Sequence, residues 1–305
     1  MNILLAIDGS DYSLAAADMI ATLPWPPDSA VKILSAVKLP FTPTEETRSL
    51  PESYYSQFEK AATDQAKTAV ETARTQVSAT NADRKNPLTI TTSVIIGHPQ
   101  EVILSQAGDW DANLIALGSR GLGGFKRFLL GSVSSEVAAR AKCSVVIVRD
   151  DEKRPIRNAR LNILLAVDGS AGSDAAVNEI ANRPWPEGSA VKVISAVEPP
   201  HPPLAGSLIL PGSFIQEWEK AIEDRARAAV EKASARLRAS GQILEVLSET
   251  IPGSARDVIL DEAEKWGADL IVLGSRGLGG FDRLLLGSVA QTVISHANCS
   301  VEIVR

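Results

Sequence analysis

The sequence predicts two α/β domains in tandem, each built on a parallel, doubly wound sheet. The first ten residues, MNILLAIDGS, return as LNILLAVDGS at 161–170, and segment 114–133 returns almost unchanged at 270–289. Within each copy, short apolar runs alternate with helix-like segments, which is the pattern of a parallel sheet covered by helices on both faces. We therefore expect domains at 1–149 and 161–305, joined by a charged, proline-containing linker at 150–160.

The elements of the first copy are predicted from its apolar runs and the residues that flank them. Residues 2–7, NILLAI, form a continuous apolar run of the kind found in a strand buried on both faces. Ser10 or Asp11 is placed to cap a helix that follows. A long helix rich in Ala, Glu, Lys and Gln is expected from about Ser53 to Ser78. The same reasoning predicts strands at 31–37, 88–96, 113–118 and 144–148, and helices at 99–107 and from 132 onward.

Composition and charge limit the classes of partner. The formal charge of −6 argues against a general nucleic-acid binder, because such domains usually carry a concentrated basic face. No apolar run approaches the roughly 20 residues of a membrane span, and the N-terminus lacks the basic segment of a signal peptide. Cys143 and Cys299 are too few for a disulfide framework, and we expect them to be buried as small apolar residues. We therefore expect a cytoplasmic protein that binds neither nucleic acid nor membrane.

The most informative segment is a glycine-patterned loop after the fourth strand of each copy. It reads GSRG at 118–121, then nine residues, then GS at 131–132, and the second copy repeats it at 274–277 and 287–288. Glycines permit positive φ and let backbone N–H groups approach a ligand, and the start of a helix favours an anion. Identical spacing in both copies indicates a phosphate site. A turn followed by a helix N-cap is the alternative.

Side chains near this loop add to the hypothesis. Ser132 offers a hydroxyl to a phosphate oxygen, and Arg127 and Arg283 offer charge beside the loop arginines. Asp8 and Asp168 end the first strand of their copies, where a carboxylate can accept hydrogen bonds from ribose hydroxyls. The alternative is that Asp-Gly-Ser forms a turn and caps the next helix.

Several common motifs are excluded. No lysine follows the glycines as in G-x-x-x-x-G-K-[ST], and no G-x-G-x-x-G follows the first strand. The histidines His98, His201 and His296 occupy no matching positions in the two copies, which argues against a shared metal cluster or Ser-His-Asp triad.

Taken together, these features resemble the universal stress protein family, and its ATP-binding branch in particular. The resemblance rests on the strand endings AIDGS and AVDGS, the glycine loop, the LLGSV entry to the next helix and the C-S-V-x-I-V last strand. It implies for each domain a five-stranded sheet of the adenine nucleotide α-hydrolase-like kind, with strand order 3-2-1-4-5. It also implies a pseudo-dimer of the two domains, and leaves open whether whole chains pair again as a homodimer.

The ligand that the resemblance implies for each domain is an adenine nucleotide: ATP, or ADP or AMP. The aspartate would approach the ribose and adenine, backbone near two alanines would line the adenine pocket, and the phosphates would lie against the glycine loop. A magnesium or manganese ion would accompany the triphosphate, held by phosphate oxygens and water, so neither a protein metal ligand nor a catalytic residue is expected. The implied residues of the first domain are Ala6, Asp8, Ala36, Gly118, Ser119, Arg120, Gly121, Gly131, Ser132, Val133 and Ser134. Those of the second are Ala166, Asp168, Ala196, Gly274, Ser275, Arg276, Gly277, Gly287, Ser288, Val289 and Ala290.

The sequence departs from the family pattern in three places. The G-x-P signature of residues 97–99 becomes Gly-Ser-Ala at 253–255, which is expected to loosen the start of that helix. Arg120 and Arg276 stand where the family often has histidine, and should strengthen phosphate contact. Glu302 stands where the first copy has Val146, so we expect its side chain to face solvent or the two last strands to be used unequally.

Three functions compete at this stage. The resemblance favours a nucleotide-responsive regulatory or stress-resistance protein with an ATP site in each domain. The second hypothesis is a slow ATPase or nucleotide-dependent transferase, although the two copies share no catalytic candidate beyond Asp8 and Asp168. The third is an interaction module with vestigial nucleotide sites, against which the intact glycine spacing counts.

Overall fold

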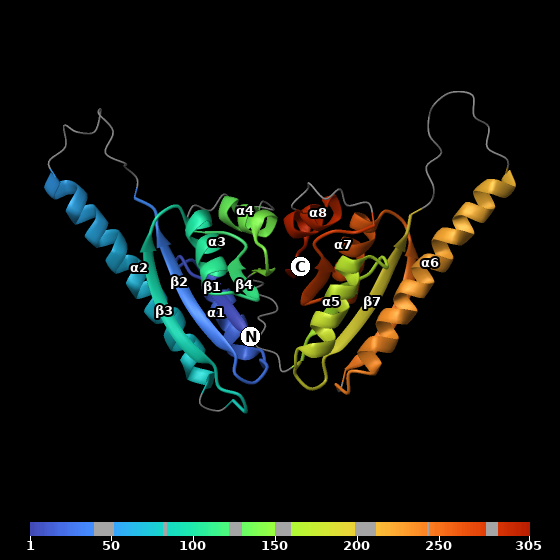
Figure 1. The fold of residues 1–305 in the computed structure, drawn as a ribbon, viewed down its shortest axis with the longest axis horizontal. Coiled ribbons are helices and arrows are strands. Elements are labelled where there is room, and N and C mark those ends of the chain that lie inside the picture. The colour runs from blue at the N-terminus through green and yellow to red at the C-terminus, as the bar shows by residue number, and fades with distance from the viewer. Residues whose placement is uncertain are drawn as a thin grey trace, which may run out of the picture. The chain divides into compact units, whose positions relative to one another are not determined.

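The computed structural model describes residues 1–39, 52–81, 84–121, 130–149, 160–198, 212–242, 244–278 and 286–305. Its contacts divide the chain into two units, Met1–Arg157 and Asn158–Arg305. The same order of strands and helices occurs in both units (Figure 1).

Strands alternate with helices in each unit, as the apolar runs predict. The first unit contains β1 (Asn2–Ala6), α1 (Asp11–Thr22), β2 (Ala30–Val37), α2 (Glu52–Asn81), β3 (Thr89–Ile96), α3 (Pro99–Asp109), β4 (Leu114–Gly118), α4 (Ser132–Arg140) and β5 (Ser144–Val148). The second contains β6 (Asn162–Ala166), α5 (Ala171–Asn182), β7 (Ala190–Val197), α6 (Gly212–Arg238), β8 (Glu245–Pro252), α7 (Ala255–Trp266), β9 (Leu270–Gly274), α8 (Ser288–His296) and β10 (Ser300–Val304).

The sheet of each unit is parallel and has the predicted strand order. In the first unit the strands lie in the order β3-β2-β1-β4-β5, and in the second the order is β8-β7-β6-β9-β10. β1 pairs with β2 on one side and with β4 on the other, and β6 pairs in the same way with β7 and β9. The predicted order 3-2-1-4-5 is therefore confirmed in both units.

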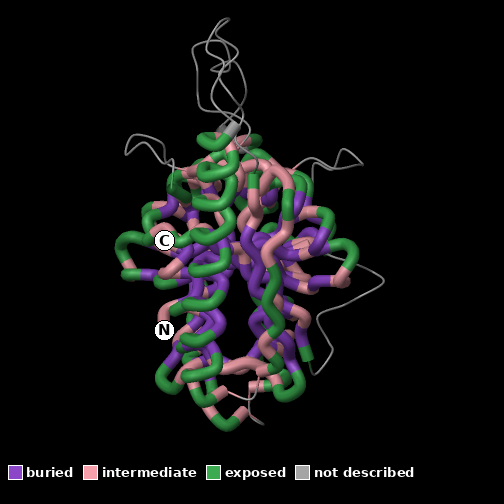
Figure 2. Tube along the Cα trace, turned by 90° about the vertical axis from the view of Figure 1, so that its right-hand side faces the viewer, coloured by how far each residue is buried: buried purple, intermediate pink, exposed green. Residues whose placement is uncertain are grey.

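Helices cover both faces of each sheet. In the first unit α1 and α2 pack together on one face, and α3 packs with α4 on the other (Figure 1). In the second unit α5 pairs with α6, and α7 pairs with α8. The central strands are buried on both faces, and buried residues also gather on the inward sides of the helices (Figure 2). This double burial explains why β1 and β4 are continuous apolar runs rather than alternating ones.

The helix starts bear on two predictions. Ser10 is the N-cap of α1, and its side chain accepts a hydrogen bond from the backbone N–H of Ser13. The other prediction concerns α7. This helix begins at Ala255, although it has no proline where α3 has Pro99. Its first intrahelical bond, from Val258 N to the carbonyl of Ser254, is 2.9 Å long, against 3.0 Å for the equivalent bond in α3. The expected loosening is therefore absent from the first turn of α7.

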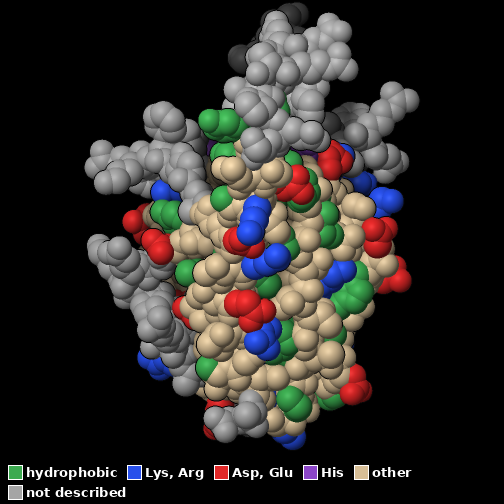
Figure 3. Space-filling model, turned by 90° about the vertical axis from the view of Figure 1, so that its left-hand side faces the viewer, with side chains coloured by type: hydrophobic (Ala, Val, Ile, Leu, Met, Phe, Trp, Pro, Cys, Tyr) green, Lys and Arg blue, Asp and Glu red, His purple; other side chains and the backbone are tan. Residues whose placement is uncertain are grey.

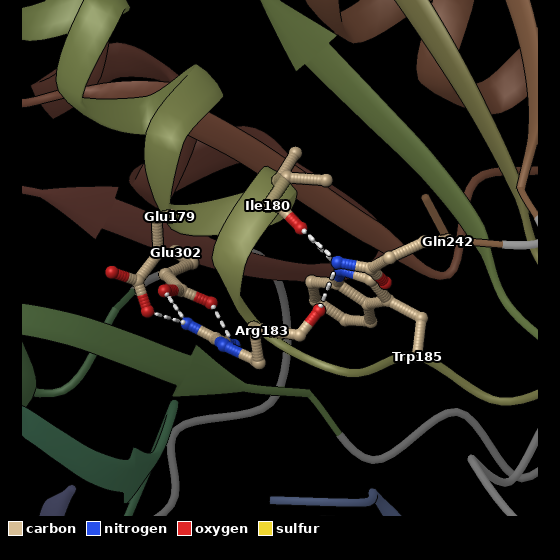
Figure 4. Close-up of polar contacts among 6 residues, drawn as sticks. All are labelled: Glu179, Ile180, Arg183, Trp185, Gln242 and Glu302. Carbon is tan, nitrogen blue, oxygen red and sulfur yellow. Dashed lines mark hydrogen bonds and ion pairs between the residues drawn. The ribbon is translucent and has the colours of Figure 1, made fainter. Parts of the chain in front are cut away.

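The prediction that Glu302 faces solvent is wrong. Its side chain is fully buried, and it forms a two-pronged ion pair with Arg183, whose Nη1 donates to Glu302 Oε2 at 2.9 Å (Figure 4). Arg183 also pairs with Glu179 at 2.6 Å, and its guanidinium lies 5.1 Å from the ring centre of Trp185. Burial opposes the charged form of Arg183, but the two carboxylates outweigh it and raise its pKa. A charge on this strand is tolerated because Arg183, the C-cap residue of α5, is its partner.

The remaining surface features are less distinctive. The exposed face that includes α2 carries Lys and Arg mixed with Asp and Glu, without a patch of one sign (Figure 3).

Cys143 and Cys299 form no disulfide and are only partly buried, so the expectation that both are buried is wrong. Within the ranges that the structure describes, no helix is both long enough and apolar enough to cross a membrane.

Candidate functional site

Each unit contains a cavity at the carboxyl ends of its two central strands. The chain leaves β1 toward β2 and leaves β4 toward β5, so the loops after these neighbouring strands diverge and open a crevice between them. The first cavity, in the first unit, has a volume of about 370 Å³, and the second cavity, in the second unit, about 410 Å³. Both volumes lie in the range of small-molecule sites, about 300–1,000 Å³.

The residues implied by the resemblance gather at these cavities. All of those named for the second domain line the second cavity. In the first domain the only exception is Ser119. The residues brought together around the first cavity are Ala6, Asp8, Ala36, Gly118, Arg120, Gly121, Gly131, Ser132, Val133 and Ser134.

Ser119 and its counterpart Ser275 hold the two ends of their loops together. The N–H of Ser119 donates to the carbonyl of Val148 at 2.8 Å, and its own carbonyl accepts from the N–H of Gly131 at 2.8 Å. Ser275 makes the same pair of bonds, to Val304 and from Gly287, at 2.8 Å each. These two hydrogen bonds fix the start of the next helix beside the end of the fourth strand, so Ser119 shapes the cavity without lining it.

The loop glycines serve close packing. Those that the structure describes lie outside the positive-φ region, so close approach rather than positive φ explains the glycines at these positions. A Cβ on Gly118 would lie 2.6 Å from the backbone carbon of Tyr12, which shows that β4 ends directly against α1. A Cβ on Gly121 would lie 2.5 Å from Asp8 Oδ2, and one on Gly277 equally close to Asp168 Oδ2. The glycines thus bring the loop backbone against the helix and the aspartate.

We expect Gly118→Ala to destabilise the first domain by about 1–3 kcal/mol, because the added methyl group meets backbone that cannot rotate away. The matched control is Gly108→Ala in α3, where a Cβ meets nothing within 4 Å and the substitution should stabilise by up to about 1 kcal/mol. Urea denaturation of the two variants measures the difference. Equal stabilities would show that the contact between β4 and α1 can relax.

Asp8 and Asp168 form the turn that was the alternative to nucleoside contact. Asp8 Oδ1 accepts from the N–H of Ser10 at 3.0 Å and from its hydroxyl at 2.6 Å. Asp168 Oδ1 accepts from the N–H of Ser170 at 2.9 Å, and its Oδ2 accepts from the N–H of Leu278 at 3.0 Å. In both domains, therefore, one carboxylate oxygen makes the turn and the other is turned toward the glycine loop.

The loop arginines lie at the cavities, but their surroundings differ. Arg120 Nη1 donates to the hydroxyl of Tyr12 at 2.9 Å, and the guanidinium lies 5.3 Å from the centre of the tyrosine ring. No described residue pairs with the side chain of Arg276. The Nε of each arginine is buried without a hydrogen-bond partner in the described part of the chain. The two arginines named beside the loops, Arg127 and Arg283, lie outside the described residues, as does His201.

The start of α4 supplies backbone donors to the first cavity. The N–H groups of its first turn have no intrahelical acceptor, and Gly131, the N-cap, has no side chain to cap them. These groups, with the helix dipole, favour an anion at this end of the cavity. The hydroxyl of Ser134 donates to the carbonyl of Gly118 at 2.7 Å, so it joins α4 to β4. Ala290 lacks this bond in the second domain.

The sequence reasoning missed the apolar end of each cavity. Leu34 and Ile103 line the first cavity, and Ile194 and Ile259 take their places in the second. Ser13 was also missed; its hydroxyl accepts from the N–H of Gly9 at 3.2 Å. The repetition of V-I-L at 102–104 and 258–260 was the available signal, but only the fold shows that one of these residues faces a cavity.

The arrangement suits a ligand with an apolar end and an anionic end. Apolar side chains line one part of each cavity, unpaired N–H groups open onto another, and the aspartate lies at the end of β1 or β6. The ionisable side chains among the described lining residues are Asp8 and Arg120 in the first cavity, and Asp168 and Arg276 in the second. Such a site can bind and orient, and its described part contains no pair of nucleophile and base.

Comparison with known proteins agrees with this picture. A family model described as the universal stress protein family matches residues 1–149 and again residues 160–305. A universal stress protein of Mycobacterium tuberculosis is 30% identical over 234 residues, which cover 74% of this chain and 72% of the relative. One from Mycolicibacterium smegmatis is 31% identical over 197 residues, 64% of this chain. The alignment spans 62% of that relative, which is less than two thirds of its length.

Solved structures support the fold. The crystal structure of a universal stress protein from Archaeoglobus fulgidus aligns with a TM-score of 0.61 at 20% identity, covering 100% of this chain and 96% of the other. At this identity the likeness concerns the fold, and two such domains account for the whole length.

Proposed function

Because the chain belongs to the universal stress protein family, we propose that it binds an adenine nucleotide in each domain and acts as a nucleotide-responsive regulatory or stress-resistance protein. The observation that supports this most is the paired cavity. In both domains an apolar end, an aspartate and a helix start lie around one space of suitable volume. A generic turn would explain the aspartate, but it would not explain why the cavity recurs with the same residues around it.

The residues of the first cavity fit the parts of such a ligand. Leu34, Ala36 and Ile103 offer apolar surface for the adenine ring. Asp8 Oδ2, which the turn does not use, is an acceptor suited to ribose hydroxyls. The N–H groups at the start of α4 and the buried, unpartnered Nε of Arg120 suit phosphate oxygens.

We also propose that Mg²⁺ or Mn²⁺ enters with the nucleotide. Among the described residues no three His, Cys, Asp or Glu side chains are grouped closely enough to hold a metal ion. Phosphate oxygens and water would therefore hold the cation, as hard divalent cations prefer. The protein's part is to orient the phosphates.

The proposal gives the nucleotide a structural rather than a catalytic effect. A ligand that binds only the folded state stabilises it by about 2.7 kcal/mol at a hundredfold excess over Kd. Cellular nucleotide would thus favour the ordered form and change the surface that partners meet. The alternative of slow ATP hydrolysis finds no additional base among the described lining residues.

Urea denaturation with and without nucleotide tests this function. We expect ATP with Mg²⁺ at a hundredfold excess over Kd to raise the free energy of unfolding of each domain by about 2.7 kcal/mol, and inorganic phosphate at the same concentration to raise it much less. Mass spectrometry of the purified protein should also detect carried adenine nucleotide. An unchanged denaturation curve with ATP, ADP and AMP, with or without divalent ions, would contradict the proposal.

A further inference from the structure

The two cavities differ most clearly in what holds the loop arginine. Tyr12 is the second residue of α1, and its counterpart in α5 is Gly172. The hydroxyl of Tyr12 accepts from Arg120 Nη1 at 2.9 Å, and the guanidinium packs 5.3 Å from the ring centre. Arg120 lines the first cavity while it makes both contacts. The tyrosine therefore holds the arginine in a position where it already borders the cavity.

The second domain cannot make this contact. A Cβ on Gly172 would collide with the backbone carbonyl oxygen of Arg276, so no larger residue fits there without moving the loop. Among the described residues the side chain of Arg276 has no hydrogen-bond or ion-pair partner, although it lines the second cavity. Nothing among the described residues holds Arg276 as Tyr12 holds Arg120, so ordering Arg276 around an anion is expected to cost more side-chain entropy than ordering Arg120.

We propose that Tyr12 is a positioning residue that orients Arg120 toward the phosphate end of the ligand and makes the first cavity the tighter nucleotide site. The proposal rests on the proposed function. A guanidinium has five N–H donors, and Tyr12 uses one of them, so the others stay available to phosphate oxygens. Holding the arginine lowers the ordering cost of binding, as preorganisation does in general. The second cavity lacks this aid and should bind nucleotide more weakly.

The sites can be measured separately by obstructing one cavity at a time. Ala36 and Ala196 are equivalent, partly buried residues of β2 and β7 that line the two cavities. Ala196→Leu places a larger side chain at the apolar end of the second cavity, where the adenine ring is proposed to bind, and leaves the first cavity to be measured. Ala36→Leu does the reverse. The test uses calorimetry of the full chain with ATP and with adenosine, which has no phosphate.

In the Ala196→Leu background we expect Tyr12→Gly to weaken ATP binding about 5–30-fold and adenosine binding less than about 3-fold. Tyr12→Phe keeps the ring and should give an intermediate loss. When Arg120→Gln is already present, Tyr12→Gly should change ATP affinity little, because the two residues act as one unit. Tyr12→Gly matches the glycine that α5 already contains, and urea denaturation checks that the variants fold.

Four results would overturn the inference. Tighter ATP binding by the Tyr12 variants would show that the tyrosine competes with phosphate for Arg120. Equal losses for ATP and adenosine, or full loss from Tyr12→Gly in the Arg120→Gln protein, would show that Tyr12 only supports the fold. If ATP binds with unchanged affinity in every variant, the positioning role fails while the proposed function stands. Absence of ATP binding in the Ala196→Leu protein and in the wild type would instead contradict the proposed function.

Discussion

Replacing Glu302 by valine is expected to lower the free energy of unfolding of the second domain by about 3–5 kcal/mol. The substitution leaves the guanidinium of Arg183 buried, with only the more exposed Glu179 beside it. Removing one partner of a buried pair costs more than the pair contributes, because the other charge stays desolvated. A guanidinium is not deprotonated in proteins, so Arg183 cannot escape the cost by losing its proton.

The first domain provides a matched control for this prediction. At the positions of Glu179, Arg183 and Glu302 it has Met19, Leu23 and Val146, all buried. The triple variant E179M/R183L/E302V should therefore recover the stability lost in E302V to within about 1 kcal/mol, or exceed the wild type.

Hydrogen exchange resolves the two domains within one chain. Amides of β6, β9 and β10 should exchange faster in E302V and return to wild-type rates in the triple variant. Amides of β1 and β4 serve as an internal control. A loss below about 1 kcal/mol in E302V, or a triple variant less stable than E302V, would show that the pair is not what holds β10 to α5.

Replacing Asp8 by asparagine is expected to weaken ATP binding at the first cavity about 10–100-fold, the effect of losing a charge-assisted hydrogen bond of about 1.5–3 kcal/mol. Asparagine keeps the oxygen that accepts from the N–H of Ser10, so the turn survives. The substitution therefore separates the turn from ligand contact, which Asp8→Ala would not do. Calorimetry in the Ala196→Leu background measures the affinity, and urea denaturation confirms that stability changes little.

Two further variants control this experiment. Asp11→Asn changes the same charge on an exposed residue that does not line the cavity, and should leave ATP affinity within about 2-fold. Asp168→Asn in the Ala36→Leu background should repeat the loss at the second cavity. If Asp8→Asn and Asp11→Asn bind ATP equally well, Asp8 acts only in the turn.

The strands could be predicted closely because each is an apolar run that is buried on both faces. The predicted 144–148 is β5 itself, and 2–7 overruns β1 by one residue. The long helix was harder to bound: it was expected from about Ser53 to Ser78 and spans Glu52–Asn81. The periodicity of a sequence predicts that a helix exists more reliably than it predicts the residues at which the helix begins and ends.

What could not be predicted depends on contacts between distant segments. Glu302 was expected in solvent because a charge interrupts an apolar strand, and its partner Arg183 lies 119 residues away. Likewise, Gly118 lines the first cavity as expected, but the sequence does not show that the backbone of Tyr12 lies directly against it. The repeat also concealed a difference between the domains. The two glycine loops are nearly identical, but the residue of α1 beside the first loop is Tyr12, and its counterpart in α5 is Gly172. Such contacts arise when segments distant in the sequence pack together, and residue patterns specify that packing only indirectly.

The stoichiometry of ATP binding, measured by calorimetry with Mg²⁺ present, decides whether each domain contains a nucleotide site. We predict about two equivalents for the wild type, about one for Ala36→Leu and one for Ala196→Leu, and none for the double variant, because each leucine obstructs the apolar end of one of the two cavities, where the adenine ring is proposed to bind. Two equivalents that persist in the double variant, or no binding by the wild type, would contradict the account.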